Sequence, residues 1–424
     1  MRGPEWLCRI PRASIQLHPS QIKAAVGCVL RRADDDVDKE TVARFEESFG
    51  RYQDSSFSIA VSSGKVALAL ILDGLGARRG DGIVMASYNV PEVISVVAGL
   101  GLRPRLADID PDTLNIDPDE VLRVADKRTR FLLITHLYGH PADIDRLVAA
   151  ADSKGLTVIE DCAQGLGATW RGRRVGTFGR ASMFSFGMMK NLNTIQGGMV
   201  CTDDEALATR VRRMVVKAGF MRRAPLLKGL ASSIGLRVAT SRAPFSLGLF
   251  PIIRVAEGLT PALLHQATKM RPAAFETGNL DIRPMISGMN GIQAAMGLAG
   301  LPRVDVANAM RAHNAVRLAS RLDGLPGVRC QMPLDAAGQS WLNFVIRVRN
   351  RLALKRSLLR EGIDTTMGFL MACNRMPSMI EDAGRCPVSE ELEDTNLYLP
   401  IWPELDDRDI DHVADSVIKA MDRK

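Results

Sequence analysis

One stretch constrains the fold of this chain more than any other: LTVIEDCAQGLGATWRGRRVGTFGRASMFSFGMMKNLNTIQGGMVCTDD, from Leu156 to Asp204. It opens with a short apolar run that ends abruptly in Glu160 and Asp161, as a buried parallel strand does where its carboxyl end reaches a pocket. A second apolar run, Ala181 to Phe186, is followed by Lys190 in a predicted loop, then by two glycines and a third apolar run. Two strand ends therefore bring a carboxylate and an amine to one place.

A lysine held in a pocket can form a Schiff base with an aldehyde, and pyridoxal phosphate (PLP) is the commonest cofactor that needs one. The cofactor also needs an anion against its pyridine nitrogen, and Asp161 is the candidate. Ser185, five residues before Lys190, is a candidate donor to the phosphate. Gln164, three residues after Asp161, is a candidate to orient the ring hydroxyl. The stretch therefore predicts a PLP site in which Lys190 is the catalytic residue.

At these residues the chain resembles the DegT/StrS family of PLP-dependent sugar aminotransferases. Members of that family carry an EDAAQ-type segment, a phosphate-binding Ser in an FSF-type segment, and a Lys followed by Asn-Leu and a GG pair. Here the segments read EDCAQ from Glu160, FSF from Phe184 and KNL from Lys190. The resemblance continues in HLYGHPADIDRL from His136, DIDPDTLNIDPDEV from Asp108, IQAAMGLAGL from Ile292 and, more weakly, LPIWPELDDRDIDHV near the end. Nearly the whole chain is covered.

The expected fold is α/β. Short apolar strands alternate with helices through the first half of the chain, which is typical of a mostly parallel sheet covered by helices on both faces. The resemblance implies the type I PLP-dependent transferase fold. We expect a large PLP-binding domain over residues 1–303 and a smaller C-terminal α+β domain over residues 304–424.

A phosphate site is predicted where the strand Phe57 to Val61 meets a turn of small residues and the helical run that begins at Val66. The first backbone N–H groups of a helix have no partner within the helix and carry the positive end of its dipole. We therefore expect Gly64, Lys65 and Val66 to bind the cofactor phosphate. The family normally has Thr where Lys65 stands. The Lys65 ammonium could serve the phosphate as a point charge, or it could point to water.

Other positions depart from the family pattern. The family places an aromatic residue on the cofactor ring shortly after the strand Ile83 to Ala86, whereas the matching residue here is Val90. Val90 could cover the ring by apolar contact, and Tyr88, two places earlier, could do so only if the register differs. His136 follows a predicted strand at the pocket edge. It is a candidate contact for substrate or cofactor, and a structural hydrogen bond is an equal alternative.

Two more family features are missing. A GYNYR-like segment precedes the IQAA helix in the family, and its Asn reaches the partner subunit's phosphate. Here Ile286 and Gly288 occupy the aligned Asn and Arg positions, and only Asn290 carries an amide nearby. The segment Gly362 to Phe369 lacks the His-Tyr pair that the family often has in its substrate cleft.

The net charge of +7 is concentrated in one segment. Between Lys217 and Arg271 there are nine basic residues and one acidic residue, of 55 and 48 in the whole chain. This segment lies in a predicted insert, about 217–291, that is longer and more apolar than its counterpart in the family. Two alternatives stay open. The segment 217–271 could meet an anionic membrane or carrier, or it could be a packed lid or dimer arm whose arginines meet carboxylates.

The amino-acid composition limits the cellular compartments and the kinds of site that fit this chain. Seven cysteines without a CxxC pair argue against a disulfide framework and a structural zinc site. No apolar stretch reaches the roughly 20 residues of a membrane-spanning helix, and the N-terminus lacks the apolar core of a signal peptide. We expect a cytoplasmic protein with no metal site and no nucleic-acid partner.

The resemblance implies an aminotransferase of polysaccharide or secondary-metabolite biosynthesis, with glutamate as the usual amino donor and a keto group of a nucleotide-linked sugar as the acceptor. Lys190 would hold the cofactor as an internal aldimine and then serve as the base and acid of the proton shift. A homodimer is also implied. One alternative is a PLP-dependent sugar dehydratase, which has His at the lysine position. Another is a regulatory or scaffold protein with impaired catalysis, suggested by the changes at Lys65, Val90, Ile286 and Gly288.

Overall fold

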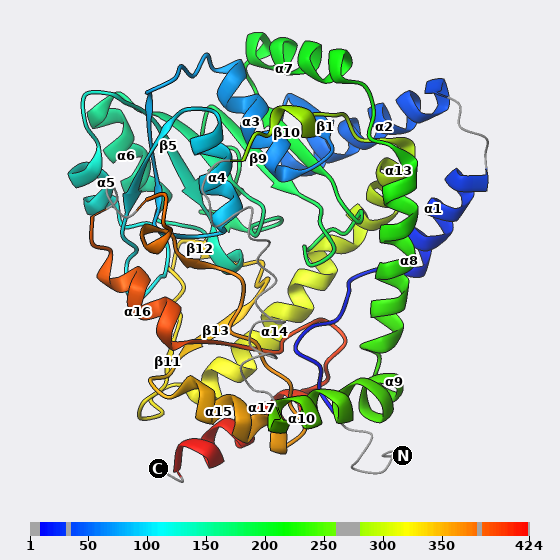
Figure 1. The fold of residues 1–424 in the computed structure, drawn as a ribbon, viewed down its shortest axis with the longest axis vertical. Coiled ribbons are helices and arrows are strands. Elements are labelled where there is room, and N and C mark those ends of the chain that lie inside the picture. The colour runs from blue at the N-terminus through cyan, green and yellow to red at the C-terminus, as the bar shows by residue number, and fades with distance from the viewer. Residues whose placement is uncertain (1–8, 31–34, 260–279, 380–383, 423–424) are drawn as a thin grey trace.

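The computed structural model describes residues 9–30, 35–259, 280–379 and 384–422 of the chain. Its central feature is a seven-stranded sheet (Figure 1). In spatial order the strands are β1 (Phe57–Val61), β10 (Gly198–Thr202), β9 (Ala181–Ser185), β6 (Thr157–Asp161), β5 (Thr129–Thr135), β2 (Gly82–Ala86) and β4 (Arg103–Ala107). The strands from β9 to β4 run parallel to one another, and β10 is antiparallel to both of its neighbours. The predicted α/β class with a mostly parallel sheet is confirmed.

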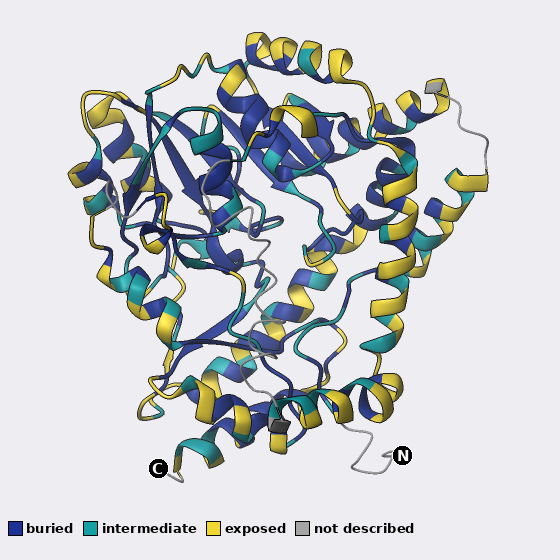
Figure 2. Cartoon of the chain, viewed as in Figure 1, coloured by how far each residue is buried: buried dark blue, intermediate teal, exposed yellow. Residues whose placement is uncertain are grey.

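The sheet separates two apolar layers. Alternate side chains of a strand point to opposite faces, and in β2 Ile83 and Met85 join one buried cluster while Val84 and Ala86 join the other. Figure 2 shows the strands as the buried centre of this part of the molecule, with helices on both sides exposing their outer faces. Burial on both faces explains why these strands are continuous apolar runs in the sequence.

Helices that cover the sheet begin where the sequence places capping residues. Ser63, Asp117, Asp143 and Asp204 each accept a hydrogen bond from a backbone N–H of the first helical turn, which stabilises the helix start. The helices around the sheet are α1 (Pro19–Leu30), α2 (Asp35–Gln53), α3 (Gly64–Gly74), α4 (Pro91–Gly99), α5 (Pro118–Val124), α6 (Ile144–Lys154), α7 (Glu205–Ala218) and α13 (Gly291–Gly300).

The C-terminal part has its own apolar cluster. It contains an antiparallel sheet in the order β11-β13-β15. Its elements are α14 (Val304–Leu322), β11 (Arg329–Cys330), β13 (Phe344–Arg347), α15 (Arg351–Arg360), α16 (Pro387–Thr395), β15 (Asn396–Leu399) and α17 (Asp407–Asp422). Ile10 also joins this cluster, because its backbone pairs with the segment around Ile363. The division into domains 1–303 and 304–424 stays a prediction.

Very short elements connect the two parts. β14 (Met371–Ala372) pairs with β3 (Tyr88–Asn89), and β12 (Ala337–Gly338) pairs with β7 (Thr169–Trp170), which also pairs with β8 (Arg173–Arg174). Single 3-10 turns are η2 (Leu137–Gly139), η4 (Arg283–Met285), η5 (Leu301–Arg303) and η6 (Cys373–Arg375). These pairings place residues of the C-terminal part beside the carboxyl ends of the parallel strands.

The basic segment folds as a helical arm, residues 223–259. It consists of α8 (Arg223–Ala239), α9 (Arg242–Pro244), the π-helical turn η3 (Phe245–Leu249) and α10 (Phe250–Leu259). In Figure 1, α8 descends along one side of the molecule near α1 and α13, and α9 and α10 pass beneath it near α15 and α17. Residues 260–279 of the predicted insert lie outside the described residues.

Arginines of the arm meet carboxylates of the body. Arg223 lies 2.8 Å from Asp38, and Arg242 lies 2.5 Å from Asp409. These contacts favour the alternative of a packed arm. Four exposed cations of this region have no ion-pair partner among the described residues: Lys217, Arg222, Lys228 and Arg254. The exposed apolar residues of the arm are Leu227, Leu236, Val238, Leu247, Ile252 and Val255.

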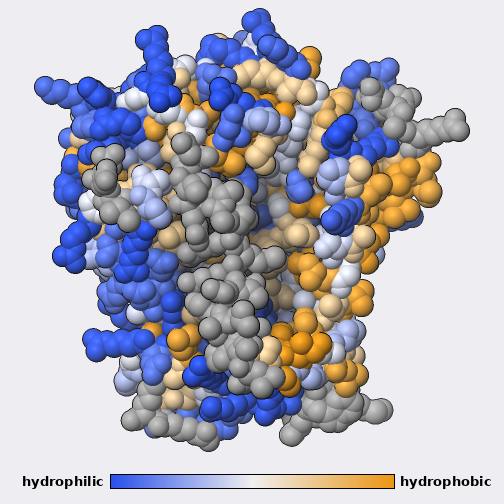
Figure 3. All heavy atoms as spheres, in the orientation of Figure 1, coloured by the Kyte–Doolittle hydropathy of each residue, from blue (hydrophilic) through white to orange (hydrophobic). Residues whose placement is uncertain are grey.

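Figure 3 shows apolar surface on the side of the molecule where α1 and the arm lie. Contact of residues 217–271 with an anionic membrane or carrier stays a prediction. Within the ranges that the structure describes, no helix is both long enough and apolar enough to span a bilayer. The cytoplasmic location stays a prediction as well.

Candidate functional site

The strand end that carries Ser185 meets the start of α3. Ser185 pairs with Gly198 of β10. A Cβ atom on Gly198 would lie 2.7 Å from the backbone nitrogen of Gly64, and a Cβ atom on Gly64 would lie 2.9 Å from the Cβ of Ser185. Both positions therefore need glycine, because any side chain would push the strand away from the helix. The structure brings together Ser185 and the helix start that the sequence predicted as a phosphate site.

The start of α3 has the features of an anion site. The side chain of Ser63 caps the helix and accepts a 3.3 Å hydrogen bond from the backbone nitrogen of Val66. Gly64 and Lys65 are the first two residues of the helix, and Lys65 is half-buried. The Ser185 Oγ has no hydrogen-bond partner among the residues that the structure describes. Backbone N–H groups, a hydroxyl and a helix dipole thus converge at one point.

Lys190 follows β9 in a loop, as predicted. Its backbone nitrogen donates to Gly187, and its Nζ lies 5.9 Å from the centre of the Phe369 ring. Burial lowers the pKa of Lys190, while the negative charges of Asp161 and Glu92 oppose this shift. A lowered pKa increases the fraction of neutral amine, which is the nucleophilic and basic form.

Asp161 ends β6 and is buried. Burial raises the pKa of this carboxyl; hydrogen bonds from the Ala163 backbone and from Thr135, and the charge of Lys190, oppose the shift. The Ala163 N–H lies 3.0 Å from Oδ1. Desolvation outweighs these contacts, so the carboxylate lacks full compensation within the chain. A cation placed against it, such as a protonated ring nitrogen, would supply that compensation.

Gln164 is held by an unusual backbone conformation. Its Oε1 accepts a 3.1 Å hydrogen bond from the backbone nitrogen of Tyr138, whose φ is 61°. A non-glycine residue in this left-handed region is uncommon and indicates a local constraint. The Nε2 of Gln164 has no partner within the described ranges, so it can donate to a ligand.

His136 is a structural residue here. Its buried ring accepts from the Ala142 backbone nitrogen at Nδ1, over 3.2 Å, and Nε2 lies 3.2 Å from Glu160. Because Nδ1 is the acceptor, Nε2 carries the proton and donates it to the carboxylate. Both ring nitrogens are therefore occupied, and the structure favours the structural alternative over a substrate contact.

Glu160 is a residue whose role the sequence interpretation missed. Its carboxylate accepts hydrogen bonds of 2.7 Å from the backbone nitrogens of Gly176, Phe178 and Gly179. These bonds and His136 lower the pKa of Glu160 against its burial. Glu160 thus anchors the loop before β9. The signal was present, because neighbouring residues in a strand face opposite sides: with Asp161 toward the pocket, Glu160 must face away from it.

Tyr88 is engaged in a buried cluster of tyrosines, which disfavours its candidate role as a substrate or ring contact. It is fully buried, its hydroxyl accepts from Asn396 over 2.5 Å, and burial raises its pKa to about 12. The hydroxyls of Tyr138 and Tyr398 lie 3.3 Å apart in the same cluster. Val90, in contrast, is half-buried at the start of α4, where it stays a candidate to cover the ring.

Asn290 does not replace the missing family Asn. It caps α13 in a reciprocal arrangement with Gln293, and its Nδ2 donates to Met221 over 3.1 Å. The backbone of Gly288 pairs with Gly219 and Met221. These residues are engaged within their own chain, so the structure supplies no substitute for the cross-subunit phosphate contact among them.

The cluster of His136, Glu160 and Cys162 has ligand atoms within 4.8 Å of one another. It does not fit a metal ion, because both oxygens of Glu160 already accept hydrogen bonds and burial raises the pKa of the Cys162 thiol well above its ordinary value. The described cysteines are all free thiols.

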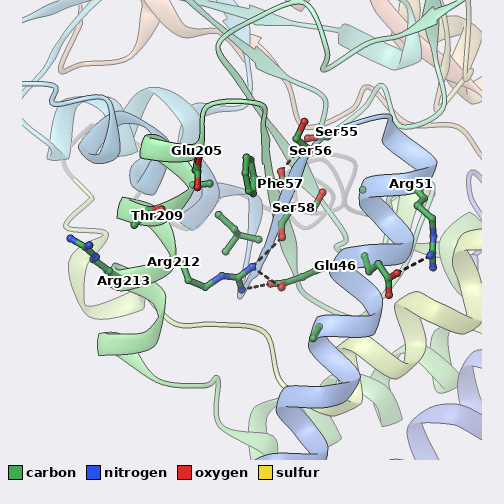
Figure 4. Close-up of a pocket in the computed structure, with 15 residues that line it drawn as sticks. Glu46, Arg51, Ser55, Ser56, Phe57, Ser58, Glu205, Thr209, Arg212 and Arg213 are labelled. Carbon is green, nitrogen blue, oxygen red and sulfur yellow. Dashed lines mark hydrogen bonds and ion pairs between the residues drawn. The ribbon is translucent and has the colours of Figure 1, made fainter.

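A cavity of about 610 Å³ lies apart from these residues, between α2 and α7 (Figure 4). There Arg212 contacts both oxygens of Glu46 at 2.8 Å, and Glu46 accepts from the Ala60 backbone nitrogen over 2.7 Å. Since β1 is the edge strand of the sheet, this ion pair covers backbone groups that would otherwise be open. The cavity contains none of the predicted site residues.

Comparisons with known proteins identify the family of this chain. A sequence model of the DegT/DnrJ/EryC1/StrS aminotransferase family matches residues 19–229 and 270–418. The chain is 30% identical over 373 residues to the erythromycin biosynthesis sensory transduction protein EryC1 of Saccharopolyspora erythraea, covering 87% of each chain. It is 30% identical over 377 residues to the dTDP-3-amino-3,4,6-trideoxy-alpha-D-glucose transaminase of Streptomyces venezuelae, covering 88% of this chain and 85% of the relative.

A solved structure extends the similarity to the fold. The crystal structure of S. venezuelae DesV in complex with a ketimine intermediate matches with a TM-score of 0.75 and 27% identity, over 98% of this chain and 99% of that chain. Residues 230–269, which contain most of the arm, lie outside the family match. Because the family match covers most of the chain on both sides of this gap, the protein belongs to the DegT/DnrJ/EryC1/StrS aminotransferase family.

Proposed function

We propose that this protein is a PLP-dependent aminotransferase that transfers an amino group from glutamate to a keto group of a nucleotide-linked sugar. One observation carries the proposal: Ser185 at the end of β9 lies against the start of α3, and the charges of Asp161 at the end of β6 and Lys190 after β9 affect each other. Three polar atoms of the predicted site residues have no hydrogen-bond or ion-pair partner in the described part of the chain: Gln164 Nε2, Ser185 Oγ and Lys190 Nζ. Such a set of unused polar atoms fits a polar ligand.

The residues fit the parts of PLP individually. Ser185 and the backbone of Gly64, Lys65 and Val66 would bind the phosphate. The Asp161 carboxylate would bind the protonated ring nitrogen, and the Gln164 amide would donate to the ring oxygen. When bound, the cofactor withdraws electrons from the carbon that loses its proton.

Lys190 would move that proton. Its lowered pKa makes the neutral amine available at Nζ, which can take a proton from the substrate carbon and return it to a neighbouring atom. The Phe369 ring beside Nζ restricts the approach of water from one side. A half-buried base shielded in this way retains the proton between the two transfers.

The acceptor class is supported by the relatives. One is named a transaminase of a dTDP-linked amino sugar, and the DesV structure holds a ketimine intermediate. The choice of glutamate rests on the family resemblance. A dehydratase activity is disfavoured, since Lys190 occupies the position at which that branch has His.

Spectroscopy tests the proposal. Purified protein incubated with PLP should absorb visible light, and borohydride should attach the cofactor covalently to Lys190, as peptide mass spectrometry can establish. Lys190→Ala should lose at least about a thousandfold in transamination rate, because it removes both the attachment point and the base. The matched control is Lys228→Ala, an exposed lysine of the arm. A protein that stays colourless with added PLP would contradict the proposal.

A regulatory role is the second candidate, because one relative is named a sensory transduction protein. The changes at Lys65, Val90, Ile286 and Gly288 are compatible with such a role. The same spectroscopic experiment separates the two candidates: PLP attachment with turnover of an amino donor supports the enzyme, whereas attachment without turnover of any donor supports the regulator.

A further inference from the structure

A second cavity is lined in part by the residues that directly follow Lys190. It has a volume of about 160 Å³, and its walls include Asn191 and Asn193, which follow Lys190 in the chain, together with His18, Arg303 and Arg237. Arg237 belongs to α8 of the arm, in the segment that the family match leaves out. The arm therefore contributes a guanidinium group to a cavity next to the catalytic loop.

Several side chains around this cavity offer hydrogen-bond donors, and Asn191 adds a buried acceptor, Oδ1, that has no partner in the described part of the chain. Ser20 donates its backbone N–H to Nδ1 of His18, so the proton of this neutral ring lies on Nε2. The Nδ2 of Asn193 is buried and has no partner in the described part of the chain. Arg303 is exposed and likewise has no hydrogen-bond or ion-pair partner among the described residues.

One carboxylate opposes these donors. Glu404 lies 3.7 Å from Arg237, which also donates to the backbone oxygen of Ile15 over 3.0 Å, and Glu404 accepts from Gln16. Two guanidinium groups and one carboxylate line the cavity, so its lining has a net positive charge. Burial, Arg303 and Arg237 together lower the pKa of His18, as expected where positive charge is not fully compensated.

We propose that this cavity binds a phosphate group, and that the arm supplies Arg237 to it. Guanidinium groups bind phosphate oxygens with charge-assisted hydrogen bonds, and the imidazole and amide N–H groups add neutral donors. The cavity is separate from the cofactor phosphate site at the start of α3, since it shares no residue with that site. The inference rests on the proposed function insofar as the phosphate belongs to the nucleotide-linked acceptor.

Two sources of phosphate have the same chemistry, namely the diphosphate of the acceptor and free inorganic phosphate. The position beside residues 191–193 favours the acceptor, because a phosphate bound there would lie against the loop that carries Lys190. If the acceptor is held at its phosphate end, the effective concentration of its keto group near Nζ of Lys190 rises.

Histidine NMR on PLP-loaded protein tests the inference. The protein is loaded with the cofactor beforehand, so that the phosphate site at the start of α3 is already occupied. The signal of His18, one of six histidines, is assigned by its loss in His18→Gln. Saturating nucleoside diphosphate should raise the pKa of His18, because the anion offsets the field of Arg237 and Arg303. Inorganic phosphate should do so only at concentrations at least about tenfold higher, since it lacks the nucleoside contacts.

Arg303→Gln should weaken binding of the nucleoside diphosphate about tenfold, and Arg303→Gln combined with Arg237→Gln should abolish the shift. The matched control is Arg254→Gln, another exposed arginine of the arm that does not line the cavity. Equal affinity for both probes would assign the site to free phosphate. The inference is wrong if neither probe changes the pKa of His18 and Arg303→Gln leaves the affinity for the nucleoside diphosphate unchanged. Attachment of PLP to Lys190 is measured on the same sample, so that a failure of the proposed function can be told apart from a failure of this inference.

Discussion

Asp161 is a buried carboxylate in an environment that disfavours its charge. Its pKa is raised because desolvation outweighs the hydrogen bonds and the charge of Lys190. A side chain of this kind lowers the stability of the cofactor-free protein and gains its compensation only when a cation is bound. Functional sites often store such unfavourable free energy.

Asp161→Asn should therefore stabilise the cofactor-free protein and abolish transamination. When the pKa of a carboxyl group is higher in the folded than in the unfolded protein, the group stabilises the fold at a pH below its unfolded pKa. This contribution is lost as the pH rises through the folded pKa. At neutral pH the charged form of Asp161 therefore lowers the free energy of unfolding, and Asn removes this cost while still accepting from Ala163. Thermal unfolding without PLP should show a higher melting temperature at pH 7, and the gain should shrink as Asp161 becomes protonated in acid.

The control for this change is Asp152→Asn, an exposed aspartate on α6, which should leave both melting temperature and activity unchanged. Lower stability of Asp161→Asn at neutral pH would show that the carboxylate is compensated within the chain.

Sequence order and spacing predicted where Asp161, Ser185 and Lys190 lie in the fold, because each of them ends or follows a strand. Asp161, Ser185 and Lys190 are where the alternation of apolar runs and polar ends places them. The buried cluster that contains Tyr88 was not predictable, since nothing in a two-residue strand indicates that its side chain packs against other tyrosines. The left-handed conformation of Tyr138, which positions Gln164, depends on tertiary contacts and has no local signal.

At the scale of elements, the sheet and its helices were predictable and the arm was not. The strands are apolar runs bounded by polar residues, and the capping residues mark helix starts. In α8, glycines at 229 and 235 weaken the helical pattern. This helix is stabilised by packing instead, because Leu226 and Leu230 join Ile292 and Met296 of α13 in one buried cluster. Long-range packing of this kind leaves little trace in a local sequence pattern.

Glu257 attaches the end of the arm to the body. Its Oε2 lies 3.0 Å from Nζ of Lys355 on α15, and both side chains are almost completely buried. Glu257→Gln would leave the Lys355 ammonium buried without its partner, which costs about 3 kcal/mol. We expect a marked loss of the free energy of unfolding in urea, with detachment of α10 visible as increased hydrogen exchange.

Two comparisons make this test specific. Arg254→Gln, on the same helix but exposed, should leave stability within about 0.5 kcal/mol of the parent. The combination Glu257→Leu with Lys355→Met replaces the pair by apolar side chains and should recover most of the loss. Equal destabilisation by the single and the combined change would mean that shape, and not the buried charge, is responsible.

At the scale of the whole molecule, apolar residues remain exposed on one face of α1. Val26, Val29 and Leu30 are 42%, 37% and 80% exposed, and Figure 3 shows apolar surface on that side of the molecule. Contiguous apolar surface of this kind marks contacts with another chain more often than scattered exposed residues do. The homodimer implied by the family resemblance would give this surface a partner.

We therefore predict a homodimer in solution, since closed two-fold assemblies are the commonest arrangement for chains of this size. Light scattering coupled to size exclusion should give twice the chain mass of 46.2 kDa. Val26→Lys combined with Leu30→Lys should shift the equilibrium toward monomer, because two charges would be buried without partners. Val316→Lys, at an exposed valine of α14, is the matched control. A monomer that retains full activity would contradict the predicted assembly, whereas a dimer unaffected by the α1 changes would place the interface on another face.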